Sequence, residues 1–421
     1  MKSVNRQTTP AKRPSHPPTP PVRGGRLRGA VPWALVCLVC LASSGAEPRG
    51  LRPGRRPMPR QAMIRQYTDL RQRNQAEARA AALQEGWAPR GTRGRVRYEL
   101  MAIRGNVPYV FKTRNLEAGV SVAVDSVRAA LPGILGQTQT VGVWDAGDVL
   151  STHQELSGRV LRMEQHGRGP SAEPSSHATH VAGTIAAAGV NPAALGMAPA
   201  AQIASYNYNR DLGEVARRAM SDPNEADMIQ VSNHSYGYAC GWDYTSTVPR
   251  WYGEYGDRQS ALFGQYDQES QSWDQICYEA PYYLSLRAAG NDRGDQAPSD
   301  GTQYEYYQGR RGWISKRYDS DTDPGDDGAD GGYDSTPPDG TAKNVMTVGA
   351  VQAAVSGAVR DVNAAAMTSF SSWGPTDDGR VKPDAVACGV RLLSCSAEGD
   401  DQYDTYSGTS MAVASATGGA A

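Results

Sequence analysis

The sequence predicts an α/β fold in which a mainly parallel central sheet lies between two helical layers, with a small α+β region in front of it. From residue 140 onward, short apolar runs alternate with segments of helical periodicity. Such alternation is typical of parallel sheets covered by helices on both faces. A chain of 421 residues that is 39% apolar is long enough for one large domain with additional parts.

Apolar periodicity and turn residues place the individual elements. In the front region we expect a helix at 66–84 and a hairpin of strands 96–102 and 107–113. In the main domain we expect strands at 141–144, 202–206, 228–232, 284–288 and 345–351, and helices at 176–188 and 273–283. Ligands bind such sheets beyond the carboxyl ends of the strands. Asp145 and Asn291 each follow closely on a strand and are expected to line that crevice.

The N-terminal segment has the pattern of a signal peptide. An apolar run of thirteen residues, 30–42, follows an Arg cluster and precedes small residues, which predicts cleavage after Ala46. A membrane anchor is the alternative, but a stable span needs about 20 apolar residues. We therefore expect a secreted protein with a signal peptide at 1–46, a linker rich in Pro and Arg at 47–64, a small folded region at 65–125 and the main domain at 126–421.

The net charge of −1 conceals a strong asymmetry. Residues 1–120 carry 23 Lys and Arg against 6 Asp and Glu, and the remainder is correspondingly acidic. A basic front can bind nucleic acid. Here the arginines are scattered among Pro, Gly and Ala without stacking aromatic residues, so we expect no nucleic-acid partner.

Four cysteines remain after removal of the signal peptide, and in an oxidising compartment they can form two disulfides. The preferred pairing is Cys388 with Cys395 and Cys240 with Cys277. Four buried free thiols are the alternative.

Three residues far apart in the sequence suit serine-based amide hydrolysis, which needs a nucleophile, a base and a carboxylate that orients the base. Ser410 begins a segment of small residues that can form a helix, so its N–H would lie at the positive end of the helix dipole. His177 lies in a second segment of this kind, and Asp145 follows a buried strand. Each has an ordinary explanation as well: a helix cap for Ser410, a turn residue for Asp145, and for His177 with His180 a metal site, which no nearby ligand supports.

Taken together, these segments resemble the signatures of the subtilisin-like serine peptidases. The matching segments are VWDAG at 143–147, HATHVAGT at 177–184 and GTSMA at 408–412, in the order Asp, His, Ser that is typical of subtilisin. By this resemblance Asp145, His177 and Ser410 form the catalytic triad and His180 is a structural neighbour.

Further segments extend the resemblance over roughly residues 141–421. AAGN at 288–291 resembles the oxyanion segment, so Asn291 would donate its side-chain amide. VSNHSYG at 231–237 resembles the substrate-binding strand, where Ser235, Tyr236 and Gly237 would pair with an extended peptide. FSSWGP at 370–375 and KPD at 382–384 are similar to the larger bacterial, oxidatively stable alkaline branch of the family.

The chain also departs from the family pattern. Ala178 replaces the usual Gly, and Ala414 with Ser415 replaces the usual Pro-His after the serine. The resemblance further implies more C-terminal elements than the residues that follow Ser410, so we expect the catalytic domain to be C-terminally incomplete.

The resemblance implies a secreted serine endopeptidase that acts on protein or peptide substrates through an acyl-enzyme. It also implies that the region 65–125 is a pro-region that inhibits the enzyme as a zymogen. The chemistry requires no cofactor. A catalytically inactive secreted module that binds peptides through Ser235 to Gly237 is the alternative.

An acidic, Gly-rich loop suggests a structural metal site. Asp319, Asp321 and Asp323 offer oxygen ligands at alternate positions, which suits calcium. Pro324 stands where an EF-hand requires glycine, so that motif is absent. A plain solvated loop is the alternative.

Overall fold

A seven-stranded sheet forms the centre of the described part of the chain, and all its neighbouring strands pair in parallel. The structure is a computed structural model that describes residues 58–84, 88, 90–93, 96–104, 107–113, 123–164, 173–220, 228–356 and 359–421. The strands lie in the order β17 (Ala385–Cys388), β14 (Met346–Val351), β11 (Leu284–Ala288), β7 (Val231–His234), β4 (Thr140–Asp145), β6 (Gln202–Asn207) and β5 (Val160–Arg162).

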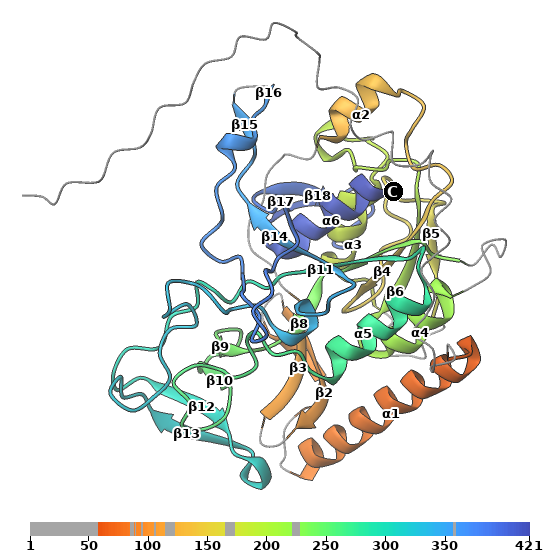
Figure 1. Cartoon of the computed structure of the whole chain (residues 1–421). Helices are drawn as coiled ribbons and strands as arrows, with labels where there is room; N and C mark the ends of the chain where they lie inside the picture. The colour runs from red at the N-terminus through yellow and green to blue at the C-terminus, as the bar shows by residue number, and fades with distance from the viewer. Residues whose placement is uncertain are drawn as a thin grey trace, which may run out of the picture. The chain divides into compact units, whose positions relative to one another are not determined.

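Helices cover both faces of this sheet (Figure 1). On one side are α3 (Ser176–Ala186) and α6 (Thr409–Ala420), and on the other are α4 (Asp211–Ala219) and α5 (Gln268–Glu279). Strand β4 shows how the sequence builds these layers, since side chains alternate along a strand. Val141 and Val143 pack with residues of α3 and α6, whereas Trp144 packs with residues of α4 and α5. The predicted α/β class is confirmed.

The region in front of the main domain contains the predicted helix and hairpin. Helix α1 (Arg60–Gln84) packs on α4 and on β2. Strand β3 (Val107–Thr113) lies between β2 (Val96–Arg104) and β8 (Tyr236–Tyr238) in a four-stranded sheet that also contains β1 (Arg90–Arg93). Two details differ from expectation: α1 begins inside the predicted linker 47–64, and α2 (Val124–Ala130) spans the predicted boundary at 125/126. The predicted signal peptide lies outside the described residues.

A second small sheet, which the sequence did not predict, lies beside the central one (Figure 1). Its strands are β13 (Trp313–Arg317), β12 (Gln303–Tyr307), β10 (Arg250–Tyr252) and β9 (Gly241–Asp243). An aromatic cluster forms its core, made of Trp242, Trp251, Tyr304, Tyr306 and Tyr318. Two short hairpins complete the described strands, β15 (Val355–Ser356) with β16 (Val359–Arg360) and β18 (Leu392–Cys395) with β19 (Tyr403–Tyr406).

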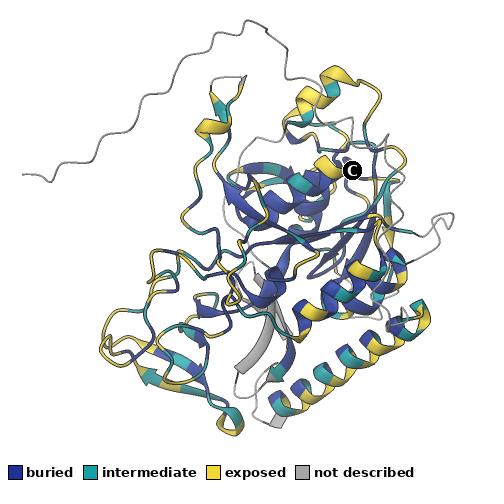
Figure 2. Ribbon diagram, viewed as in Figure 1, coloured by how far each residue is buried: buried dark blue, intermediate teal, exposed yellow. Residues whose placement is uncertain are grey.

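Several predicted boundaries shift by a few residues. The helix predicted at 273–283 begins at Gln268, because the Asp267 side chain accepts a hydrogen bond from the Ser270 N–H and caps it. Figure 2 shows that buried residues concentrate in the central sheet and in the helix faces turned toward it. Among the described residues, no helix combines the length and the apolar character needed to cross a bilayer.

Candidate active site

The candidate residues lie where parallel strands of the central sheet end. Strand β4 ends at Asp145, and its neighbour β7 ends at His234, next to Ser235. Strand β11 pairs with β7 on the other side and leads to Asn291. Because the carboxyl ends of parallel strands meet at one edge, the sheet brings Asp145, Ser235 and Asn291 to the same edge.

Asp145 holds the imidazole of His177. The Nδ1 atom of His177 lies 2.9 Å from Oδ1 and 2.8 Å from Oδ2 of Asp145, and the Asp145 side chain is fully buried. The Ala146 N–H also donates to Oδ1 at 2.7 Å. A carboxylate that accepts from Nδ1–H fixes the tautomer in which Nε2 can take up a proton. This pair therefore has the geometry of an oriented general base.

Helix α3 places His177 in its first turn. The Ser175 side chain caps this helix by accepting from the Ala178 N–H at 3.3 Å. Small residues then let α3 pack closely against α6, whose first turn carries Ser410. Two helices that pack on each other thus supply the candidate base and the candidate nucleophile.

Ser410 is the second residue of α6 and is hydrogen-bonded to Ser235, the residue that follows β7. Its Oγ donates to the Ser235 carbonyl at 3.2 Å, and the Ser235 hydroxyl donates back to the Ser410 carbonyl at 3.0 Å. Gly408 precedes the helix with φ of 152°, a conformation that favours glycine. Because Ser410 lies in the first turn of α6, its N–H is at the positive end of the helix dipole, where an oxyanion is stabilised.

Asn291 is held beside the nucleophile by Thr409. Its Oδ1 accepts from the Thr409 N–H and from the Thr409 hydroxyl, both at 2.9 Å. These bonds use the amide oxygen, and the amide nitrogen Nδ2 is the donor that an oxyanion role requires. Thr409 stands in the GTSMA segment directly before Ser410, but the sequence alone does not show that it bonds Asn291.

His180 has the surroundings of a packing residue. It is fully buried, its Nε2 lies 3.0 Å from the Leu392 carbonyl oxygen, and its ring stacks on Tyr406. Burial lowers the pKa of His180 to about 3, so the ring is neutral near pH 7. In the described part of the chain no group of three His, Cys, Asp or Glu side chains is arranged to hold a metal ion.

The predicted substrate-binding segment forms strand β8, and its edge is occupied. Strand β3 pairs antiparallel with β8, with Lys112 opposite Gly237 and Thr113 opposite Tyr236. The backbone of Tyr236 pairs with β3, and its fully buried side chain lies in the core. A peptide that paired with this edge would have to displace β3.

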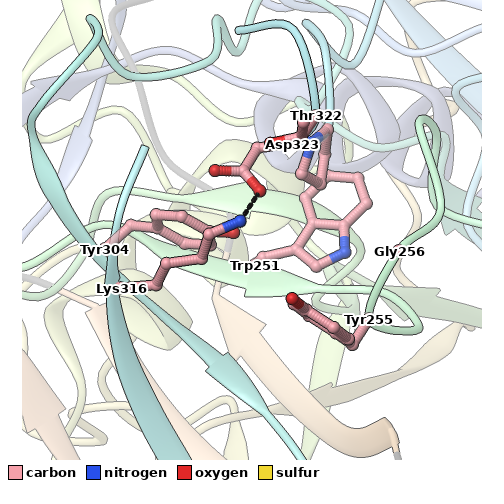
Figure 3. A pocket seen from close by; sticks show the side chains of 8 residues that line it. Trp251, Tyr255, Gly256, Tyr304, Lys316, Thr322 and Asp323 are labelled. Carbon is pink, nitrogen blue, oxygen red and sulfur yellow. Dashed lines mark hydrogen bonds and ion pairs between the residues drawn. The ribbon is translucent and has the colours of Figure 1, made fainter. Parts of the chain in front are cut away.

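The acidic loop predicted to bind calcium places Asp323 in contact with neighbouring residues. Asp323 is buried and forms an ion pair with the Lys316 ammonium, and it accepts a hydrogen bond from the Asp319 N–H at 2.9 Å. Figure 3 shows this ion pair beside Trp251, Tyr255 and Tyr304, in a cavity of about 110 Å³. Asp323 thus already has a cationic partner, and calcium binding by Asp319, Asp321 and Asp323 stays a prediction.

The predicted disulfides are not formed, and the four cysteines are buried thiols. Cys395 packs against Gly183 of α3, whereas the Cys388 thiol donates to the Val390 carbonyl at 4.0 Å. Cys240 and Cys277 lie in the apolar cluster between the sheet, α4 and α5. Burial raises the pKa of the Cys277 and Cys395 thiols to about 12, so both are protonated near pH 7.

Comparison with known proteins gives three results. The model of the Subtilase family matches residues 136–421. An uncharacterized protein of Aquifex aeolicus (strain VF5) is 38% identical over 86 residues, and the match spans 18% of this chain and 39% of that relative. Among solved structures, the prenylagaramide maturation protease PagA matches with 17% identity and a TM-score of 0.41, covering 71% of this chain and 78% of the other.

Proposed function

The chain belongs to the subtilase family of serine peptidases, and we propose on that premise that it is a secreted endopeptidase with the triad Asp145, His177 and Ser410. The observation that carries this assignment is the buried carboxylate of Asp145 at 2.8 and 2.9 Å from Nδ1 of His177. Its position at the carboxyl edge of the sheet, next to strand β7 whose following residue Ser235 bonds Ser410, supports a common site.

The first half of the reaction forms an acyl-enzyme. Oγ of Ser410 attacks the carbonyl carbon of the scissile bond while its proton passes to Nε2 of His177. The resulting oxyanion accepts hydrogen bonds from the Ser410 N–H and from Nδ2 of Asn291. As the carbon–nitrogen bond breaks, His177 returns the proton to the leaving amine. Asp145 stays ionised and stabilises the imidazolium.

The second half releases the acid. Water attacks the acyl carbon and gives a proton to His177, and collapse of the second tetrahedral intermediate returns that proton to Oγ of Ser410. No group outside these side chains and water is needed. The segments at 370–375 and 382–384 support a place in the larger bacterial, oxidatively stable alkaline branch.

The elements α1 to β3 act as an inhibitory pro-region. The pairing of β3 with β8 supports this role, because an extended substrate needs the edge that β3 occupies. Ser410 is fully buried and His177 nearly so, which agrees with a closed, zymogen-like state. The mature enzyme would arise when a cut after Thr113 releases this region. Secretion follows from the signal peptide at 1–46.

A fluorophosphonate probe for active-site serines tests the assignment. After α1 to β3 are removed by limited proteolysis, we expect covalent labelling of the wild type that disappears in Ser410→Ala, while Ser415→Ala, a buried serine on the same helix, keeps it. A folded wild type that is not labelled after this removal would instead favour the inactive peptide-binding module.

A further inference from the structure

One guanidinium joins the pro-region to two helices of the main domain. Arg71 of α1 is 4% exposed, and its Nη2 lies 2.7 Å from Oδ1 of Asp211 and 2.7 Å from Oε1 of Glu269. Asp211 is the first residue of α4, and Glu269 lies in the first turn of α5. Three helices therefore meet at a single cation.

Both carboxylates depend on this cation. The side chains of Asp211 and Glu269 are 0% and 3% exposed, and a buried charge that loses its partner is strongly destabilising. Burial by itself would lower the pKa of Arg71, but Asp211 and Glu269 raise it well above its ordinary range. Arg71 is thus a permanent positive charge at this junction.

Asp211 also holds the substrate-binding strand. Its second oxygen, Oδ2, accepts a hydrogen bond from the Tyr236 hydroxyl at 2.8 Å. Tyr236 belongs to β8, which is three residues long and lies at the end of its sheet. A strand this short has few backbone bonds, so side-chain contacts contribute much of its fixation. At its other end, the Tyr238 N–H donates to Asp339 at 3.0 Å.

The other charged or titratable groups around Asp211 come from neighbouring elements. Arg287 of β11 lies over the rings of Trp273 and Tyr236, at 4.3 and 5.2 Å. His234 of β7 bonds the Tyr236 hydroxyl through Nδ1 at 2.9 Å. Burial raises the pKa of Asp211, and Arg71 followed by Arg287 oppose that rise. When α1 leaves, Arg287 is the remaining cation that acts on Asp211 among these described groups.

We propose that Asp211 is a positioning residue for strand β8 and that Arg71 of the pro-region controls it. With α1 docked, Arg71 fixes one oxygen of Asp211 and the other oxygen fixes Tyr236, so helix docking and the pairing of β3 with β8 reinforce each other. Departure of α1 and β3 removes the ion pair and opens the edge of β8, while the bond from Tyr236 to Asp211 keeps the strand in place for a substrate. The last step rests on the proposed peptidase function.

Hydrogen exchange of the full-length Ser410→Ala chain, read by mass spectrometry, tests the coupling without requiring activity. Arg71→Met should speed exchange at least tenfold in both α1 and β8. Arg73→Met is the matched control, because Arg73 is an exposed arginine on the same helix, and it should change neither. Tyr236→Phe removes one hydroxyl and should speed exchange in β8 alone.

Faster exchange in α1 without a change in β8 for Arg71→Met would overturn the proposal, as would unchanged β8 exchange in Tyr236→Phe. A second measurement uses the processed enzyme. Tyr236→Phe should lower kcat/KM about tenfold for a peptide long enough to pair with β8, and less than twofold for a single-residue ester. Equal losses on both substrates would show a general structural role and contradict positioning. If the processed wild type were not labelled by the serine probe, the proposed peptidase function would be wrong, but the exchange result would remain valid.

Discussion

The proposed catalytic residues and the proposed substrate-binding strand lie at the same edge of the main domain, but different contacts hold them. Asp145, His177 and Ser410 stand at ends of regular elements whose backbone bonds belong to the central sheet and to helices α3 and α6. Strand β8 is short, lies outside the central sheet and pairs with β3. The Tyr236 hydroxyl of β8 donates a hydrogen bond to Asp211, and Asp211 forms an ion pair with Arg71.

This difference indicates which part of the site would change if α1 to β3 were removed. Removal of α1 to β3 takes away no backbone bond of β4, α3 or α6, so the catalytic geometry should persist. The same removal deprives β8 of its strand partner and Asp211 of its arginine. We therefore expect maturation to act on substrate binding and not on the alignment of the triad.

The largest expected effect concerns the nucleophile. Ser410→Ala should lower kcat about a million-fold, the scale known for loss of the nucleophile in serine peptidases. In this variant the Ser235 hydroxyl keeps its hydrogen bond to the carbonyl of residue 410, so the exchange of β8 should remain close to that of the parent chain. Peptide hydrolysis and hydrogen exchange on the same sample check both statements, and residual hydrolysis within tenfold of the parent would place the nucleophile elsewhere.

The orienting carboxylate comes next. Asp145→Asn should lower kcat about 10⁴-fold, since an amide can donate to Nδ1 and favour the wrong imidazole tautomer. KM for an extended peptide should change little, because β8 is untouched. Steady-state kinetics separate the two constants, and a loss confined to KM would contradict the assigned role.

A smaller loss is expected at the oxyanion donor. Asn291→Leu should lower kcat about 100- to 1,000-fold. Thr409→Val sharpens this test, because it removes one of two hydrogen bonds to Oδ1 of Asn291 and keeps the Thr409 N–H. It should cost only about fivefold. If both variants had equal kcat, Asn291 would not be the donor.

The smallest expected effect concerns Asp334, a carboxylate that belongs neither to the proposed triad nor to strand β8. Asp334 has its Oδ1 buried without a hydrogen-bond partner in the described structure, and burial, with Asp377 and Asp330 adding to it, raises its pKa to about 6. A raised carboxyl pKa favours the folded state below the ordinary pKa near 4, and this contribution is lost as pH rises through 6. Asp334→Asn should therefore stabilise the chain at pH 8 by about 1 kcal/mol after solvent screening.

Urea unfolding of Asp334→Asn at pH 8 and at pH 4 measures this difference. Most of the gain should disappear at pH 4, where the parent carboxyl is largely protonated. Asp321→Asn is the control, since Asp321 is exposed, and it should change the free energy of unfolding little at either pH. An equal gain at both pH values would show that titration of Asp334 is not the cause.

The sequence predicts the catalytic side better than the substrate side for a physical reason. Each catalytic residue lies in a contiguous motif on one strand or helix, so local pattern is sufficient. β11 has the predicted bounds 284–288, and β4 and β6 lie within a residue of theirs. The ion pairs of Arg71 join residues 140 and 198 positions apart, which no local pattern encodes.

The second sheet escaped prediction for a related reason. Its strands are three to five residues long, rich in Tyr and Trp, and separated by polar segments. Their aromatic side chains bury one another and form a separate cluster, so no alternation directed at the main core is needed. The predicted cysteine pairing was wrong because spacing in the sequence does not reveal which element each thiol packs against.

Maturation of the full-length chain is the most direct test of the account. Purified wild-type chain and Ser410→Ala should be incubated side by side and followed by intact-mass spectrometry. We expect the wild type to convert to a shorter chain that has lost α1 to β3, while Ser410→Ala stays at full length. Conversion of both chains at the same rate would show that Ser410 is not responsible. Conversion of neither chain, when the wild type is labelled by a serine probe, would show that α1 to β3 are not a removable pro-region.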